Sequence, residues 1–116
     1  MLSVAVIGSR SFSNYSLLEK TLDAISITRI ISGGAIGADL LAKRYAKAKG
    51  LEYVEHLPNY NFYGKLAPIL RNQRIIDEAS MVIAFWDGKS KGTKNALDYA
   101  RKTNKEIKIV KIQAGE

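Results

Sequence analysis

The sequence lacks cysteine altogether and contains a single histidine. Without cysteine the chain has no disulfides, no thiolate chemistry and no cysteine-ligated metal, and one histidine excludes a histidine-rich metal site. Long apolar runs are missing too. The run at residues 4–7 is far too short to span a membrane, and no basic segment precedes it as in a secretory signal. We therefore expect a cytoplasmic protein with no membrane partner, no metal and no cofactor.

Repeats, low-complexity segments and linkers are also absent from the 116 residues. This length is typical of one domain around one hydrophobic core, so we expect residues 1–116 to form a single domain. A content of 47% hydrophobic and 25% charged residues is that of an ordinary globular protein.

Acidic residues are few relative to basic ones, and the formal net charge is +7. The excess lies in the last third of the chain, where only Asp98, Glu106 and Glu116 oppose the basic residues. A basic stripe can follow a nucleic-acid backbone, but lysines on an exposed helix and an edge strand also keep proteins soluble. Both interpretations stay open. The basic residues are Lys89, Lys91, Lys94, Arg101, Lys102, Lys105, Lys108 and Lys111.

Strand and helix patterns alternate along the whole chain. Short apolar runs predict strands near 3–8, 29–32, 51–55, 80–86 and 107–112, and the longer helical period predicts helices near 15–25, 37–49, 66–78 and 92–103. In the second helix the expected buried stripe consists of Leu41, Tyr45 and Ala48.

This alternation predicts an α/β fold with a Rossmann-like, doubly wound parallel sheet of five strands and helices on both faces. Because crossovers are right-handed, we predict the strand order 3-2-1-4-5. Ligands bind such sheets beyond the carboxyl ends of the strands, here between the first and fourth strands.

Three glycine-bearing turns follow predicted strands at this edge, at residues 8–10, 33–37 and 88–93. Glycine lets backbone N–H groups approach a ligand closely, and the first turn of a helix leaves N–H donors that favour phosphate. Glycine also closes such turns where no ligand binds, but three together favour a site for a phosphate-bearing molecule. The turns are neither a Walker A loop nor a GxGxxG fingerprint. The candidate glycines are Gly8, Gly33, Gly34, Gly37 and Gly92.

Polar residues in and beside these turns are the further candidates for ligand binding. Arg10 offers a fork of donors to a phosphate, and Ser9 adds a hydroxyl. Thr93 is expected either to hydrogen-bond a phosphate or to cap the last helix. Asp39 is expected either to stabilise the N-terminus of its helix through the helix dipole or to accept hydrogen bonds from ribose hydroxyls. Asp87, after Trp86 at the end of the fourth strand, is the candidate catalytic or ribose-binding carboxylate.

The segment at residues 59–65 is aromatic, polar and expected to be irregular. It contains Tyr63 and ends at Lys65. One interpretation is that the segment covers the site and stacks an aromatic ring on the base of a ligand. The other is that its aromatic side chains close one end of the hydrophobic core. Arg71 and Asn72 follow at the start of the third helix and are expected to point toward the site. His56 is expected to be a packing or surface residue.

Together these motifs resemble the SLOG superfamily, which includes the DNA-processing protein DprA and the LOG phosphoribohydrolases. The resemblance is strongest to its small, stand-alone, YspA-like members of unknown function. It rests on residues 8–12, 32–39, 63–65, 71–72 and 85–93. It implies a Rossmann-like fold and a site for a nucleotide or nucleotide-derived ligand, in the manner of nucleotide-sensing domains of bacteria and phages.

The resemblance leaves the activity open. LOG enzymes carry glutamates soon after their Gly-Thr turn, whereas here residues 94–97 contain no carboxylate before Asp98. A sensor and a hydrolase of an N-glycosidic or phosphate bond are both compatible with the sequence. The alternative is a DprA-like module that binds or processes single-stranded DNA. Exposed aromatic residues make a homodimer or larger homo-oligomer plausible.

Overall fold

The computed structural model describes residues 2–113. Five parallel strands form one sheet in the order β3-β2-β1-β4-β5, which confirms the predicted order. The central strand β1 pairs Val4 with Ile30 of β2 on one side and with Met81 of β4 on the other. Because all strands are parallel, their carboxyl ends meet at one edge of the sheet. The strands are β1 (Ser3–Gly8), β2 (Arg29–Ser32), β3 (Glu52–Glu55), β4 (Met81–Trp86) and β5 (Glu106–Lys111).

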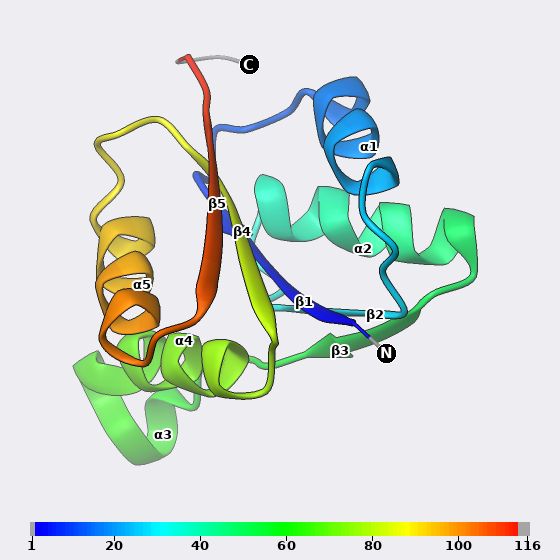
Figure 1. Cartoon of the computed structure of the whole chain (residues 1–116). Helices are drawn as coiled ribbons and strands as arrows, with labels where there is room; N and C mark the ends of the chain where they lie inside the picture. Colours follow the sequence, from blue (N-terminus) through cyan, green and yellow to red (C-terminus); the bar gives the residue numbers. More distant parts are fainter. Residues whose placement is uncertain (1, 114–116) are drawn as a thin grey trace.

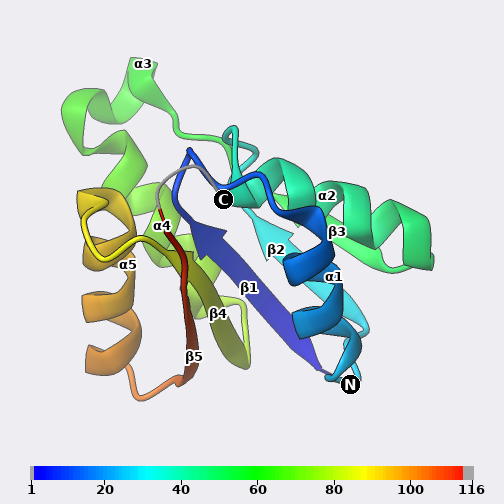
Figure 2. The same cartoon turned by 90° about the horizontal axis from the view of Figure 1, so that it is seen from above.

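Helices cover both faces of the sheet (Figures 1 and 2). On one face lie α1 (Tyr15–Asp23) and α2 (Ala38–Lys49), and on the other lie α4 (Ala67–Asp77) and α5 (Lys91–Lys102). A short helix α3 (Tyr60–Tyr63) and a 3₁₀ turn η1 (Gly64–Leu66) precede α4 and extend away from the sheet beside it. Within residues 2–113, none of the helices has the length and hydrophobicity needed to cross a bilayer.

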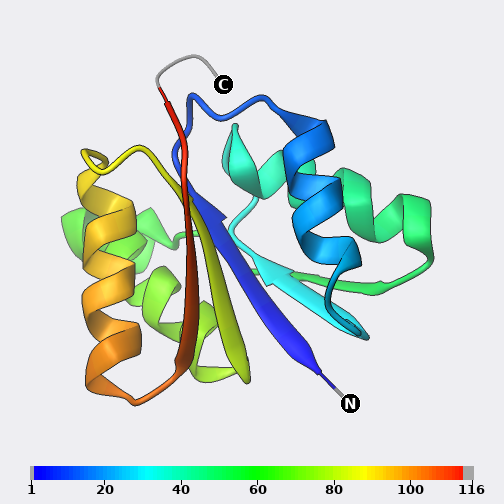
Figure 3. The ribbon, with the colours of Figure 1, turned by 45° about the horizontal axis from the view of Figure 1, so that its top comes forward.

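Alternate side chains of β1 enter two separate cores. Val4 and Val6 pack toward α1 and α2, whereas Ala5 and Ile7 pack toward α4 and α5, and none is more than 6% exposed. Figure 3 shows the sheet between these two helical layers. Burial on both faces explains why β1 and β4 are continuous apolar runs rather than alternating ones.

Two local predictions were wrong in detail. In α2, Tyr45 is buried as predicted, but Leu41 is half-buried and Ala48 is exposed. The other apolar residues buried in this helix are Ala38, Ala42 and Ala46. Methyl groups on the inner face let the helix lie close to the sheet. The segment expected to be irregular instead forms α3 and η1, because Asn59 Oδ1 caps α3 by accepting from Phe62 N at 3.1 Å.

Candidate functional site

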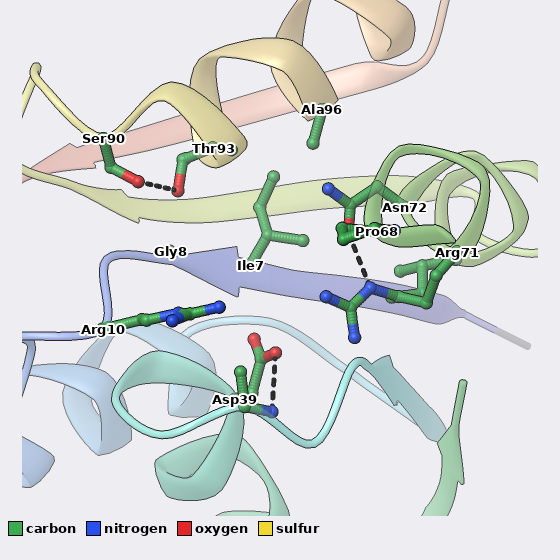
Figure 4. Close-up of a pocket in the computed structure, with 13 residues that line it drawn as sticks. Ile7, Gly8, Arg10, Asp39, Pro68, Arg71, Asn72, Ser90, Thr93 and Ala96 are labelled. Carbon is green, nitrogen blue, oxygen red and sulfur yellow. Dashed lines mark hydrogen bonds between the residues drawn. The ribbon is translucent and has the colours of Figure 1, made fainter. Parts of the chain in front are cut away.

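A cavity of about 120 Å³, here named the edge cavity, opens at the carboxyl ends of the strands between the N-terminal ends of α4 and α5. Its floor is apolar and its walls carry charged and hydrogen-bonding groups (Figure 4). It lies where the doubly wound topology places ligands. The lining residues are Ile7, Gly8, Arg10, Ala35, Asp39, Pro68, Arg71, Asn72, Ile75, Ser90, Gly92, Thr93 and Ala96.

Two arginines from different elements face this cavity. Figure 4 shows the Arg10 and Arg71 side chains directed into the same space, with the Asp39 carboxylate between them in this view. Arg10 is exposed on the loop after β1, and its side chain makes no hydrogen bond or ion pair within residues 2–113. An unengaged guanidinium at a cavity wall is available to an anionic ligand.

Arg71 is held in place by the protein itself. Its Nη1 group donates to Gly33 O at 2.9 Å and to His56 O at 3.3 Å, and its Nε donates to Asn72 Oδ1 at 2.9 Å. These bonds fix the guanidinium across the ends of β2 and β3. A cation that is positioned before the ligand arrives loses little side-chain entropy on binding.

The first turn of α5 leaves backbone donors at the cavity. Ser90 is the N-cap residue, but its side chain makes no capping bond and instead lies 3.3 Å from Thr93 Oγ1. The amides of Gly92 and Thr93 have no partner in the described part of the chain. A methyl group added at Gly92 would meet nothing within 4 Å, so a ligand can approach these amides closely.

Asp39 is the carboxylate that lines the edge cavity. It is 9% exposed, and its Oδ2 accepts from Ala35 N at 3.2 Å. Burial raises the pKa of Asp39 above its usual range, against the opposing effects of the Ala35 hydrogen bond and the Arg71 charge. A buried carboxylate beside two cations can accept hydrogen bonds from sugar hydroxyls.

The raised pKa of Asp39 predicts that this residue costs stability at neutral pH. Since the folded pKa lies above the unfolded one, stability falls as the pH rises from about 3.8 through the folded pKa. Replacing Asp39 with asparagine, which can still accept from Ala35, should therefore raise the melting temperature at pH 7. The difference from the wild type should shrink in acid. A lower melting temperature at pH 7 would contradict this, because it would mean that attraction to Arg71 outweighs the burial.

The loop at residues 33–37 shapes the site rather than lining it, since only Ala35 from this loop faces the edge cavity. A Cβ at Gly33 would lie 2.6 Å from Arg71 Nη1 and 2.9 Å from Asp39 Oδ2. At Gly34 a Cβ would meet the Glu55 side chain. Gly33 thus provides the space in which the Arg71 guanidinium and the Asp39 carboxylate come together. The prediction that the amides of Gly33 and Gly34 hold phosphate gains no support from this geometry.

Gly8, Ser9 and Gly37 hold the strand ends against one another. A Cβ at Gly8 would lie 2.4 Å from Phe85 O, and Ser9 N donates to Phe85 O at 3.0 Å. Ser9 is buried, and its carbonyl accepts from Ala38 N at 3.3 Å. These contacts place the Arg10 loop between β4 and the start of α2.

Asp87 and Trp86 organise the turn before α5. Asp87 Oδ1 accepts from Lys89 N and Ser90 N, both at 2.8 Å, and these bonds lower the pKa of Asp87. The Trp86 indole N–H donates to Ser90 O at 3.1 Å. Neither residue lines the edge cavity. The catalytic assignment of Asp87 therefore stays a prediction, and the carboxylate that lines the edge cavity together with the two arginines is Asp39.

Other predicted residues lie farther out. Tyr63 and Lys65 are exposed on α3 and η1 and do not line the edge cavity. His56 contacts Glu78 through Nε2. Lys105, in the connection between α5 and β5, donates to Ala79 O at 2.8 Å, and Lys94 pairs with Asp98 at 2.9 Å. None of the basic residues between Lys89 and Lys111 lines the edge cavity.

Sequence reasoning missed part of the lining. The apolar lining residues Ile7, Ile75 and Ala96 were not among the predicted site residues, because apolar residues carry no chemical signal of a site. Ser90 had a usable signal, since serine two residues before a Gly-Thr helix start is a typical N-cap. Within residues 2–113, no group of three or more His, Asp or Glu side chains is placed to hold a metal ion.

Known proteins share this fold. A sequence model of the YspA, cpYpsA-related SLOG family matches residues 2–63. The X-ray structure of DNA processing protein A (DprA) from Streptococcus pneumoniae is similar with a TM-score of 0.79 and 20% identity, over 94% of this chain and 50% of that one. The chain thus spans half the length of that protein. No curated protein matches the sequence significantly.

A second similar structure is DNA processing protein A from Helicobacter pylori, from a study of its single-stranded DNA binding mode. The TM-score is 0.73 and the identity 23%, over 99% of this chain and 67% of that one. With sequence identities of 20% and 23%, the similarity to these two structures shows a shared fold and no more.

Proposed function

The chain belongs to the YspA, cpYpsA-related SLOG family, and from that premise we propose that its edge cavity binds the phosphate and sugar of a nucleotide or nucleotide-derived molecule. The observation that carries the proposal is the convergence of unlike donors on one small space. Arg10, Arg71 and the amides at the start of α5 supply positive potential for a phosphate. Asp39 supplies an acceptor for sugar hydroxyls.

The size of the cavity limits what it holds. At about 120 Å³ it is smaller than the roughly 300–1,000 Å³ of pockets that enclose a whole drug-sized ligand. It suits a phosphorylated sugar better than a complete nucleotide. The base of the ligand then lies outside the edge cavity.

The proposal is tested by thermal shift and calorimetry with AMP, ADP-ribose and phosphoribosyl compounds, on the wild type and on Gly92→Val. The valine side chain extends from the first turn of α5 into open space and shields the Gly92 and Thr93 amides. We expect affinity for the best ligand to fall about tenfold, the equivalent of about 1.4 kcal/mol.

Asn95→Val, on the exposed surface of the same helix, is the matched control and should bind like the wild type. Wild-type protein that is not shifted by any of the phosphorylated compounds would reject the proposal. Equal binding by folded Gly92→Val would remove the amides of α5 from it.

A second candidate function is binding of single-stranded DNA. The fold likeness to the Helicobacter pylori protein, whose structure concerns single-stranded DNA binding, favours it, and so does the net charge of +7. This candidate predicts that affinity for an oligonucleotide falls steeply as salt rises. Binding of mononucleotides that is insensitive to salt, with no affinity for oligonucleotides, would exclude it.

A further inference from the structure

A patch of exposed apolar side chains lies on the far side of α4 from the edge cavity. Phe62 is 76% exposed, Leu57 64% and Tyr60 58%, and Tyr63 and Leu66 are exposed as well. We name residues 57–66 the aromatic segment. Figures 1 and 2 show that its helix α3 stands at a corner of the molecule, away from the sheet. Contiguous exposed apolar surface of this kind marks a binding site more often than chance placement does.

A second cavity, of about 230 Å³, lies between the aromatic segment and α4, and we name it the α4 cavity. It is nearly twice as large as the edge cavity. Apolar and aromatic side chains form part of its wall, and amide and charged groups form the rest. Its lining residues are Leu57, Asn59, Tyr63, Ala67, Leu70, Arg71, Gln73, Arg74 and Asp77.

Arg71 connects the two cavities because it lines both of them. Its guanidinium is anchored to Gly33 O and His56 O at the ends of the neighbouring strands. Arg74 lines the α4 cavity one turn farther along the helix. The only carboxylate among the described lining residues, that of Asp77, accepts from Tyr99 OH at 2.7 Å. Arg71 thus places a positive charge between the two cavities, and the two arginines of the α4 cavity outnumber its single carboxylate.

Two rings of the aromatic segment, those of Phe62 and Tyr63, are exposed to a partner. Phe62 and Tyr63 meet edge to face, with ring centroids 4.7 Å apart, so the two rings present faces in different directions. Tyr63 lines the α4 cavity while Phe62 is directed largely to solvent. Exposed rings beside arginines are the combination that stacks on unpaired bases while holding the phosphates between them.

We propose that the α4 cavity and the exposed rings of the aromatic segment bind an unpaired base of a single-stranded nucleic acid, whose neighbouring phosphate and sugar occupy the edge cavity. This inference rests on the proposed function, because the same ligand runs from the edge cavity past Arg71 into the α4 cavity. An apolar peptide would use the rings but would gain nothing from Arg71 and Arg74. The volume of the edge cavity also requires the rest of the ligand to lie outside it.

The inference is tested with Phe62→Ala and Tyr63→Ala, whose side chains are exposed and so are not needed for the core. The probes are a short oligothymidylate, an abasic oligonucleotide of the same length and thymidine monophosphate. We expect each variant to bind oligothymidylate about tenfold more weakly, in line with stacking energies of one base. Binding of thymidine monophosphate and of the abasic strand should not change.

Leu40→Ala is the matched control, because Leu40 is an apolar residue 45% exposed on α2, on the other face of the sheet. It should leave all three affinities unchanged. Equal weakening for thymidine monophosphate would overturn the inference, since the α4 cavity would then take the base of the same nucleotide. Unchanged binding of oligothymidylate would overturn it as well.

Failure of the proposed function gives a different pattern. Thymidine monophosphate would then bind Gly92→Val as well as it binds the wild type, or would not bind at all, whatever the aromatic variants do to the oligonucleotide. Melting temperatures of all variants confirm that a loss of affinity is not a loss of fold.

Discussion

Replacement of Gly37 with alanine is expected to lower the melting temperature by roughly 10 °C or more, the largest effect on stability that we predict. Gly37 has φ +89° and ψ −132°, a conformation that side-chain-bearing residues rarely adopt. A Cβ there would also lie 2.4 Å from Ser9 O and 2.6 Å from Arg10 Cα. Backbone strain and overpacking each cost about 1–3 kcal/mol, and both apply at this position.

The matched control is Gly92→Ala, the same chemical change at a site where the new methyl group meets nothing within 4 Å. Its melting temperature should stay close to that of the wild type. Thermal unfolding followed by circular dichroism measures both variants. A Gly37→Ala protein as stable as Gly92→Ala would show that the Arg10 loop is not held as tightly against α2 as these distances imply.

Arg10→Ala should weaken binding of the best phosphorylated ligand by roughly 10- to 100-fold, the largest effect on binding that we predict. Hydrogen bonds to charged groups contribute about 1.5–3 kcal/mol, and Arg10 has no partner within residues 2–113 that would compete for it. For the same reason stability should change by only about 0.5 kcal/mol or less. Calorimetric titration gives the affinity, and a melting curve gives the stability.

Arg101→Ala provides the comparison, because it removes one positive charge from the exposed end of α5 without touching the edge cavity. It should leave the affinity for a mononucleotide nearly unchanged. If both arginine variants weaken binding equally, the ligand responds to the overall charge of +7 and not to a contact with Arg10.

Much of the fold was predictable from local patterns. The apolar runs at β1 and β4 are typical of strands buried on both faces, and the alternation with helices leaves few topologies once crossovers are right-handed. The same topology places the site between β1 and β4. Arg10 and the Gly92-Thr93 helix start then follow, because both come directly after these strands.

What sequence reasoning could not supply was the purpose of individual residues. A glycine that exposes an amide and a glycine that makes room for a distant side chain look alike in a sequence. Gly33 belongs to the second kind, since the group it accommodates is the Arg71 guanidinium from α4. Asp87 was similarly ambiguous, because a carboxylate after a strand can cap its own turn, as it does here.

The packing of α2 shows a related limit. Helical periodicity predicts which face of a helix is buried, but not which residues lie at the centre of that face. Alanines give a weaker hydrophobic signal than bulky residues, so a buried row of alanines is easily overlooked. Here the inner face is centred on Ala42 and Ala46, because the start of α2 must approach Ser9 closely enough for Ala38 N to donate to its carbonyl. The close approach of α2 to the loop after β1 thus accounts for the small residues on the inner face of this helix.

The central place of β1 has a consequence for how the protein is made. β1 is synthesised before the other four strands, yet one of its two partners, β4, follows only after α4, and the register pairs Val4 with Met81. On the ribosome, β1 can pair with β2 as soon as β2 has been made. Its other edge can pair with β4 only after the intervening elements up to α4 have been made. The pairing of β1 with β4 closes a long loop, which slows folding. The edge cavity, which needs residues from both the β1 loop and α5, is therefore among the last features to form.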